Sequence, residues 1–202
     1  HQMQVCVTAL AANGVEIIEG FPKLPEMRQA FLTLRGLFFV AELGELYATH
    51  RDQLKDTVVW NIEQGLKLTA AELAHAEKLR SAARRQLEDY MQSHRLDALA
   101  GPTNQVLPFD LETPYVSEID GQRLETYVDW LASNFIFSVA GLPALSLPGG
   151  FARPSPQQLP LPVGLQLVGP WAGDDALMNT SEQIESILAP LNAPFSFPDP
   201  LA

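Results

Sequence analysis

Apolar residues recur at helical spacing in the first half of the chain and alternate in short runs in the second half. The clearest helical pattern starts at Thr69-Ala70-Ala71-Glu72, a sequence typical of a capping box, in which the Thr hydroxyl and the Glu carboxylate each bind a free backbone amide. An apolar stripe at spacings of three and four follows it: Leu73, Ala76, Leu79, Ala83, Leu87 and Tyr90. The stripe predicts a long helix with one face packed into the core.

Other segments predict helices with weaker patterns. Asn13-Gly14 is a natural stop for the first of them, whereas Gly36 and Gly44 argue against one continuous helix in the second. The expected helices are Met3 to Ala12, Glu26 to Tyr47, Asp52 to Gln64, Glu125 to Ser138 and Asp174 to Leu188.

Short apolar runs bounded by Gly and Pro predict strands at Val15 to Ile18, at Leu96 to Ala100, at Ala144 to Leu147 and at Val163 to Leu167. Because these runs lie between the expected helices, they indicate an α/β fold with a mixed β-sheet flanked by α-helices. The length of 202 residues fits a single domain covering residues 1–202.

Two segments carry neither pattern. Asn104 to Leu124 is polar, with a turn expected at Asp120-Gly121, and is interpreted as a surface loop able to cap a pocket. The tail from Asn192 to Ala202 contains three prolines and is expected to be irregular.

Charge and composition exclude several classes of function. The net charge of −11 argues against a nucleic-acid partner, which would require clustered Lys and Arg. No apolar run approaches the roughly 20 residues that span a membrane. The single Cys6 excludes an internal disulfide and favours a reducing compartment, so the cytoplasm is the expected location. The four histidines show no metal-ligand spacing.

The stretch from Ala140 to Pro170 has the detail of a family signature. It contains Gly-Leu-Pro-Ala-Leu-Ser-Leu-Pro-Gly-Gly and, after a Pro-rich connector, Leu-Pro-Val-Gly-Leu-Gln-Leu-Val-Gly-Pro. It resembles the C-terminal region of the amidase signature family of serine amide hydrolases. The strand before Gly101-Pro102-Thr103 and the acidic start of the last helix at Asp174-Asp175 are similar to the same family.

The resemblance implies cleavage of a carboxylic amide to an acid and ammonia or an amine, without a metal or an organic cofactor. In the family a serine nucleophile, a second serine with a cis peptide bond and a lysine base lie in a Gly/Ser-rich stretch upstream of the matched region. This chain has ten serines, no two of them adjacent, and none of its four lysines is near a Gly-Ser loop. We therefore expect no catalytic residue in this chain, and no amide turnover without an upstream half.

Six residues are candidates for the wall of a substrate pocket beside the absent serine: Thr103, Trp130, Phe137, Ser138, Gly141 and Gln166. For each, packing or a structural hydrogen bond is the competing interpretation, and Gly and Pro around Gly141 most often punctuate structure. Ser138 holds a position where family members often carry Asn. Gln166 lies in an apolar strand and should have a hydrogen-bond partner if it is buried.

Other functions remain open at this stage. The alternative interpretations are a non-catalytic binding or structural module, and part of a subunit resembling the amidotransferases that amidate mischarged tRNA. Sheet edges left unpaired would favour self-association, so a homodimer is also expected.

Overall fold

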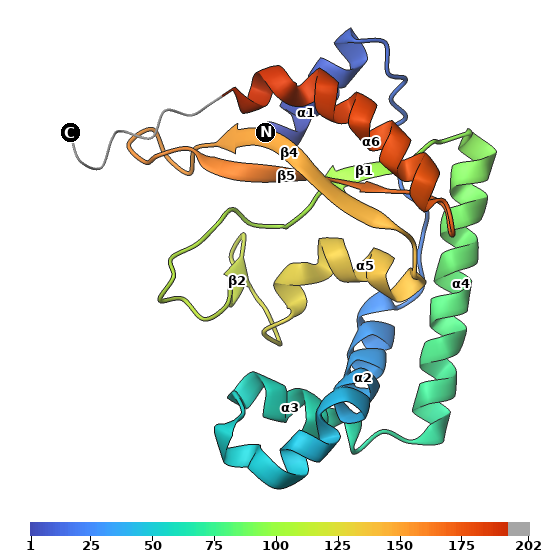
Figure 1. Cartoon of the computed structure of the whole chain (residues 1–202), viewed down its shortest axis with the longest axis vertical. Coiled ribbons are helices and arrows are strands. Elements are labelled where there is room, and N and C mark those ends of the chain that lie inside the picture. Colours follow the sequence, from blue (N-terminus) through green and yellow to red (C-terminus); the bar gives the residue numbers. More distant parts are fainter. Residues whose placement is uncertain (194–202) are drawn as a thin grey trace.

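The computed structural model describes residues 1–193 and arranges them in layers around a small sheet (Figure 1). Strand β5 (Leu161–Val168) lies in the centre, with β1 (Leu99–Pro102) on one side and β4 (Ala144–Ala152) on the other. Both ladders are antiparallel. The α/β class is confirmed, as are the two strands that the alternating runs predicted.

One face of the sheet is covered by α1 (Gln2–Ala12) and α6 (Asp174–Leu188). Leu147, Leu165 and Leu167 point to this side and pack with side chains of both helices in one buried cluster. Cys6 belongs to this cluster, where its thiol donates to the carbonyl of Gly149 at 3.2 Å. Burial raises the pKa of the Cys6 thiol above its ordinary value, so the thiol stays protonated.

The opposite face receives α5 (Ala132–Ala140) and α4 (Ala70–His94), which runs along the side of the molecule in Figure 1. Leu99 and Val168 of the sheet pack there against Leu87 and Met91 of α4. The capping box at the start of α4 is formed as expected: Thr69 Oγ1 accepts from the Glu72 amide at 3.2 Å, and Glu72 Oε2 accepts from the Thr69 amide at 2.8 Å.

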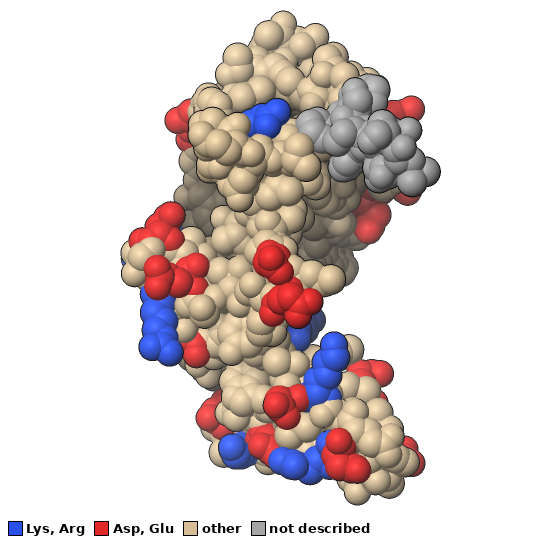
Figure 2. Space-filling view, turned by 90° about the vertical axis from the view of Figure 1, so that its left-hand side faces the viewer, with Lys and Arg blue, Asp and Glu red and all other residues tan. Residues whose placement is uncertain are grey.

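Below the sheet in Figure 1, α2 (Met27–His50) and α3 (Asp56–Gly65) form a helical lobe, with the 3-10 turn Arg51–Gln53 between them. Contrary to expectation, α2 continues through Gly36 and Gly44. The reason is a close approach: a β-carbon on Gly36 would lie 3.1 Å from the Cα of Gly65. On the face shown in Figure 2, charged side chains of both signs lie on this lobe, whereas the described surface at the sheet end is mostly uncharged.

Several expected boundaries were wrong. Val15 to Ile18 is not a strand in the part of the chain described, because none of the sheet ladders includes it. The helix expected from Glu125 is a 3-10 turn at Asp129–Leu131 followed by α5. The loop after β1 contains a small hairpin of β2 (Glu118–Ile119) and β3 (Gln122–Arg123).

The turn of that hairpin is where it was predicted, at Asp120 and Gly121, both with positive φ. The last helix matches its expected bounds, and a 3-10 turn (Ala189–Asn192) follows it. The expectation for the tail falls largely on residues 194–202, outside the described residues. Within residues 1–193, no helix is long and apolar enough to cross a membrane.

Candidate functional site

Polar side chains form a row across the sheet on the face turned toward α5. The ladders place Ser146 of β4 opposite Gln166 of β5, and Thr103 follows the last residue of β1. Thr103 continues the pairing through its amide, which donates to the carbonyl of Gly164 at 3.0 Å. The antiparallel register therefore brings together residues that are far apart in the sequence.

The hydroxyls of Thr103 and Ser146 meet above Gly164, with their oxygens 2.6 Å apart. A β-carbon on Gly164 would lie 2.5 Å from Thr103 Oγ1 and 2.6 Å from Ser146 Oγ. Glycine is thus the residue that lets the two hydroxyls meet across the central strand. Both hydroxyls remain near the surface, where they are able to bind a polar ligand.

Gln166 is buried, and its Nε2 donates to the carbonyl of Ser133 at 3.0 Å, as expected for a buried amide. Ser133 in turn donates from Oγ to the carbonyl of Thr103, also at 3.0 Å. These two bonds join β5, the start of α5 and the end of β1. The polar row is therefore held rigidly against the N-terminal turn of α5.

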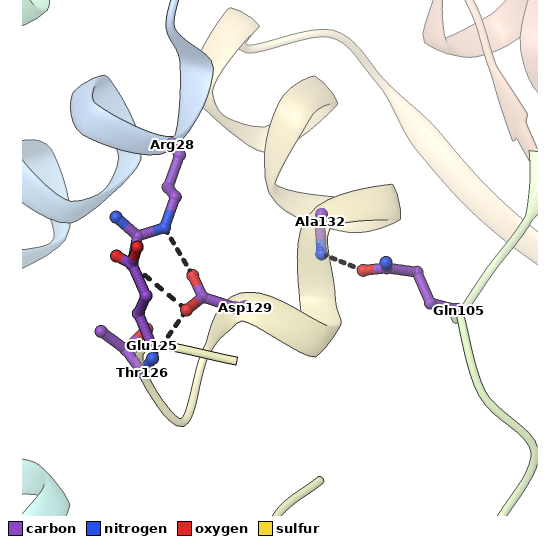
Figure 3. Close-up of polar contacts among 6 residues, drawn as sticks. All are labelled: Arg28, Gln105, Glu125, Thr126, Asp129 and Ala132. Carbon is purple, nitrogen blue, oxygen red and sulfur yellow. Dashed lines mark hydrogen bonds and ion pairs between the residues drawn. The ribbon is translucent and has the colours of Figure 1, made fainter. Parts of the chain in front are cut away.

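The same turn is tied to its surroundings by further bonds (Figure 3). Gln105 Oε1 accepts from the amide of Ala132 at 2.8 Å. Asp129 accepts from Arg28 Nε at 2.7 Å and from the amide of Thr126 at 2.7 Å. Partial burial acts to raise the pKa of Asp129, but the bonds from Arg28 and Thr126 outweigh it and hold that pKa below its ordinary value.

At its other end, α5 stops at Gly141 in the left-handed conformation, with φ of 72°. A β-carbon there would lie 2.7 Å from Arg84 Nη2. Arg84 donates from Nε to the carbonyl of Ala140 at 2.8 Å and lies over the ring of Trp171. Gly141 therefore makes room for an arginine that closes the helix end, which is a structural role.

The six candidates separate into different places. Thr103 and Gln166 belong to the polar row. Phe137 packs edge-on against Phe21, and Ser138 donates to the carbonyl of Asn134 in its own helix. Trp130 precedes α5 and packs edge-on against Phe109.

Ser133 and Ser146 were not candidates from the sequence, although both belong to the row. The strand alternation around Ser146 was a usable signal, since it puts the serine on the face opposite the partly buried Leu145 and the buried Leu147. Among the described residues, neither the Thr103 nor the Ser146 hydroxyl bonds to a lysine, histidine or carboxylate. The pair is thus suited to holding a polar ligand and lacks a partner base to activate it as a nucleophile.

Comparison with known proteins gives consistent results. The family model described as Amidase matches residues 1–178. The A subunit of glutamyl-tRNA(Gln) amidotransferase from Sulfolobus acidocaldarius is 38% identical over 91 residues, 45% of this chain and 17% of that protein. The corresponding subunit from Anaeromyxobacter sp. is 35% identical over 121 residues, 59% of this chain and 22% of that protein.

Solved structures agree in fold. One amidase superposes with a TM-score of 0.78 at 24% identity, covering 93% of this chain and 41% of that chain. 6-Aminohexanoate cyclic dimer hydrolase, solved with its substrate, gives a TM-score of 0.73 at 20% identity, covering 93% of this chain and 40% of that chain. The chain thus spans about two-fifths of the length of these enzymes. Since the family model covers most of the sequence, this chain belongs to the amidase family, and its fold is that of the amidase signature enzymes.

Proposed function

We propose that this chain is the C-terminal part of an amidase domain, a single unit over residues 1–202, which hydrolyses a carboxylic amide to an acid and ammonia or an amine. The observation that carries the proposal is the family match over residues 1–178. In this proposal the serine nucleophile, the cis-serine and the lysine base come from an upstream half. No two of the ten serines in this sequence are adjacent, which supports that assignment.

Within this proposal the chain supplies one wall of the substrate pocket. Thr103 presents its hydroxyl beside Ser146, and Gln166 fixes the start of α5 through Ser133. Trp130 adds apolar surface near the same helix end. Phe137, Ser138 and Gly141 lie toward the far end of α5 and would act by shaping the helix and its turn.

The test compares two proteins with the same reagents. The 202-residue chain and the complete product of its reading frame are incubated with a fluorophosphonate serine probe and a panel of simple amides. We expect labelling and turnover only with the complete product. Saturable labelling of the 202-residue chain would contradict the upstream origin of the nucleophile, and an inactive complete product would contradict amide hydrolysis.

A second candidate is the A subunit of an amidotransferase. It is favoured by the curated relatives, which are glutamyl-tRNA(Gln) amidotransferase A subunits at 38% and 35% identity. Because the net charge of −11 disfavours contact with RNA, another subunit would bind the tRNA in that case. Glutamine-dependent transfer of ammonia to glutamyl-tRNA by the complete product with its partner subunits, without release of free ammonia, would favour this candidate over a hydrolase.

Location and assembly are part of the same proposal. A cytoplasmic location is supported by a single cysteine that is buried and protonated. A homodimer is supported by the sheet, in which β1 and β4 each pair with β5 only among the described residues. Unpaired strand edges favour association with another chain. A non-catalytic binding module is the outcome if the complete product neither labels nor turns over.

A further inference from the structure

A cleft of about 750 Å³ lies between the first turn of α3 and the segment that leads from Pro114 to Tyr127. Its size is in the range typical of small-molecule sites, roughly 300–1,000 Å³. Trp60, Tyr115 and Tyr127 form its aromatic wall, and Lys55, Asp56 and Glu125 supply charged groups. It is built from different residues than the polar row of Thr103, Ser146 and Gln166.

The aromatic wall has a defined geometry. Tyr127 is in edge-to-face contact with Trp60, at 5.8 Å between ring centroids and 82° between planes. Tyr115 contacts Tyr127 from another direction, at 6.0 Å and 61°. Rings set at such angles offer both faces and edges to a further ring, and both arrangements are favourable for aromatic pairs.

Tyr127, the middle ring of this wall, is held by the buried Asn61 and the partly buried Arg35. Its hydroxyl accepts hydrogen bonds from Asn61 Nδ2 and from Arg35 Nη2. Arg35 also donates to Asn61 Oδ1 at 3.0 Å and lies 4.7 Å from the centre of the Phe39 ring. Because Tyr127 is already fixed, a ligand does not have to order it on binding.

Charged side chains of both signs lie at the cleft. Glu125 forms an ion pair with Arg28 at 3.0 Å. Lys55 and Asp56 are neighbours of opposite sign at the start of α3. Because Arg28 is also bound to Asp129, these five side chains carry one negative charge in excess, which disfavours an anionic ligand.

We propose that this cleft binds a ligand without negative charge that is built on a flat aromatic or heteroaromatic ring, which packs against Trp60, Tyr115 and Tyr127. The proposal goes beyond amide hydrolysis and does not depend on it, because the aromatic wall and the charged groups beside it all belong to this chain. Binding, and not turnover, is therefore the quantity to measure.

The experiment uses the 202-residue chain and ligand-observed NMR titrations with four probes. Benzamide and cyclohexanecarboxamide carry the same uncharged group on a flat and on an aliphatic ring. Benzoate and benzylammonium carry a negative and a positive charge. We expect saturable binding of benzamide, and roughly two- to tenfold weaker binding of cyclohexanecarboxamide, from the usual strength of one aromatic contact.

The matched variants are Tyr115→Ala and Phe109→Ala. Both remove a partly exposed ring from the same segment, but Phe109 packs against Trp130 and does not line the cleft. Tyr115→Ala should weaken benzamide binding at least about threefold, while Phe109→Ala leaves it within twofold, as expected for one lost aromatic contact.

Three results would overturn the proposal. The first is an absence of saturable benzamide binding. The second is an equal effect of the two variants. The third is a preference of more than tenfold for benzoate over benzamide, which would show that the cleft selects an anion.

Discussion

Replacing Gly164 with alanine tests whether the Thr103 and Ser146 hydroxyls are held together across the central strand. The new β-carbon would lie 2.5 Å from Thr103 Oγ1, 2.6 Å from Ser146 Oγ and 2.9 Å from Thr103 Cβ. These separations are far below ordinary contact, so at least one side chain must move. Overpacking costs about 1–3 kcal/mol, and loss of the hydroxyl pair adds about 0.5–1.5 kcal/mol. Because the pair is near the surface and has room to move, we expect Gly164→Ala to lower the free energy of unfolding by about 1–2 kcal/mol.

Gly101 provides the matched control in the same sheet. A β-carbon there meets no heavy atom within 4 Å, and its φ is outside the left-handed region. Gly101→Ala should therefore stabilise by about 0.4–1 kcal/mol, since alanine restricts the unfolded chain. The two substitutions are expected to have opposite signs in urea denaturation followed by circular dichroism, with unchanged slopes.

A third variant examines the cause of the effect. Adding Ser146→Gly to Gly164→Ala removes one of the crowded oxygens and should recover part of the lost stability. The reasoning is refuted if Gly164→Ala is as stable as Gly101→Ala, or if the double variant recovers nothing.

Three further predictions concern the lobe, the acid response and assembly. Gly65→Ala should destabilise the chain by about 1–3 kcal/mol, because its β-carbon would meet the Gly36 backbone. Gly44→Ala should instead stabilise the chain by up to about 1 kcal/mol, because alanine has the higher helix propensity. Thermal unfolding measures both effects, and equal effects would contradict the close approach of the two helices. Folding lowers the pKa of Asp129, so its carboxylate stabilises the fold at neutral pH, and this contribution disappears as the pH falls below about 4. Asp129→Asn should therefore cost about 1–2 kcal/mol at pH 7 and progressively less as the pH falls below about 4 in urea titrations. A cost that does not depend on pH would rule out the charged bond to Arg28 as its cause. Light scattering of the 202-residue chain should show dimers or larger species if the edges of β1 and β4 recruit another chain, and a monodisperse monomer would exclude that.

Local chemistry explains the elements that the sequence predicted well. Thr69 and Glu72 bind each other's amides whatever the rest of the chain does, so the start of α4 could be located from four residues. Asp120-Gly121 encodes its own turn in the same way, because both residues tolerate positive φ. The alternating runs predicted strands β4 and β5, because alternation of apolar and polar residues between Gly and Pro boundaries is typical of a strand.

The errors arose where a distant contact overrode the local signal. Gly36 was interpreted as a break, yet α2 is continuous because Gly65 of α3 packs against that glycine. Val15 to Ile18 has strand composition but no neighbouring strand to pair with, and a strand requires a partner. Glu125 to Leu131 has helical composition, but Asp129 binds Arg28 and the Thr126 amide and holds the segment in a turn.

The candidate site was only partly predictable for the same reason. Thr103 and Gln166 were identified as polar residues at the end of a strand and inside an apolar one. Their partners, Ser146 and Ser133, are 43 and 33 residues away in sequence, and no local pattern links either serine to its partner. Phe137 and Gly141 were included because of the motif around them, and the structure gives them packing and turn contacts.

The sequence by itself determined the family, the class of fold, the capped helix and the paired strands, because these follow from neighbours within a few positions. Only the tertiary structure decided which hydroxyls meet over Gly164, which glycines allow helices to touch, and where an aromatic cleft opens. Such features depend on strand register and helix packing, which join residues far apart in the chain and leave no local pattern.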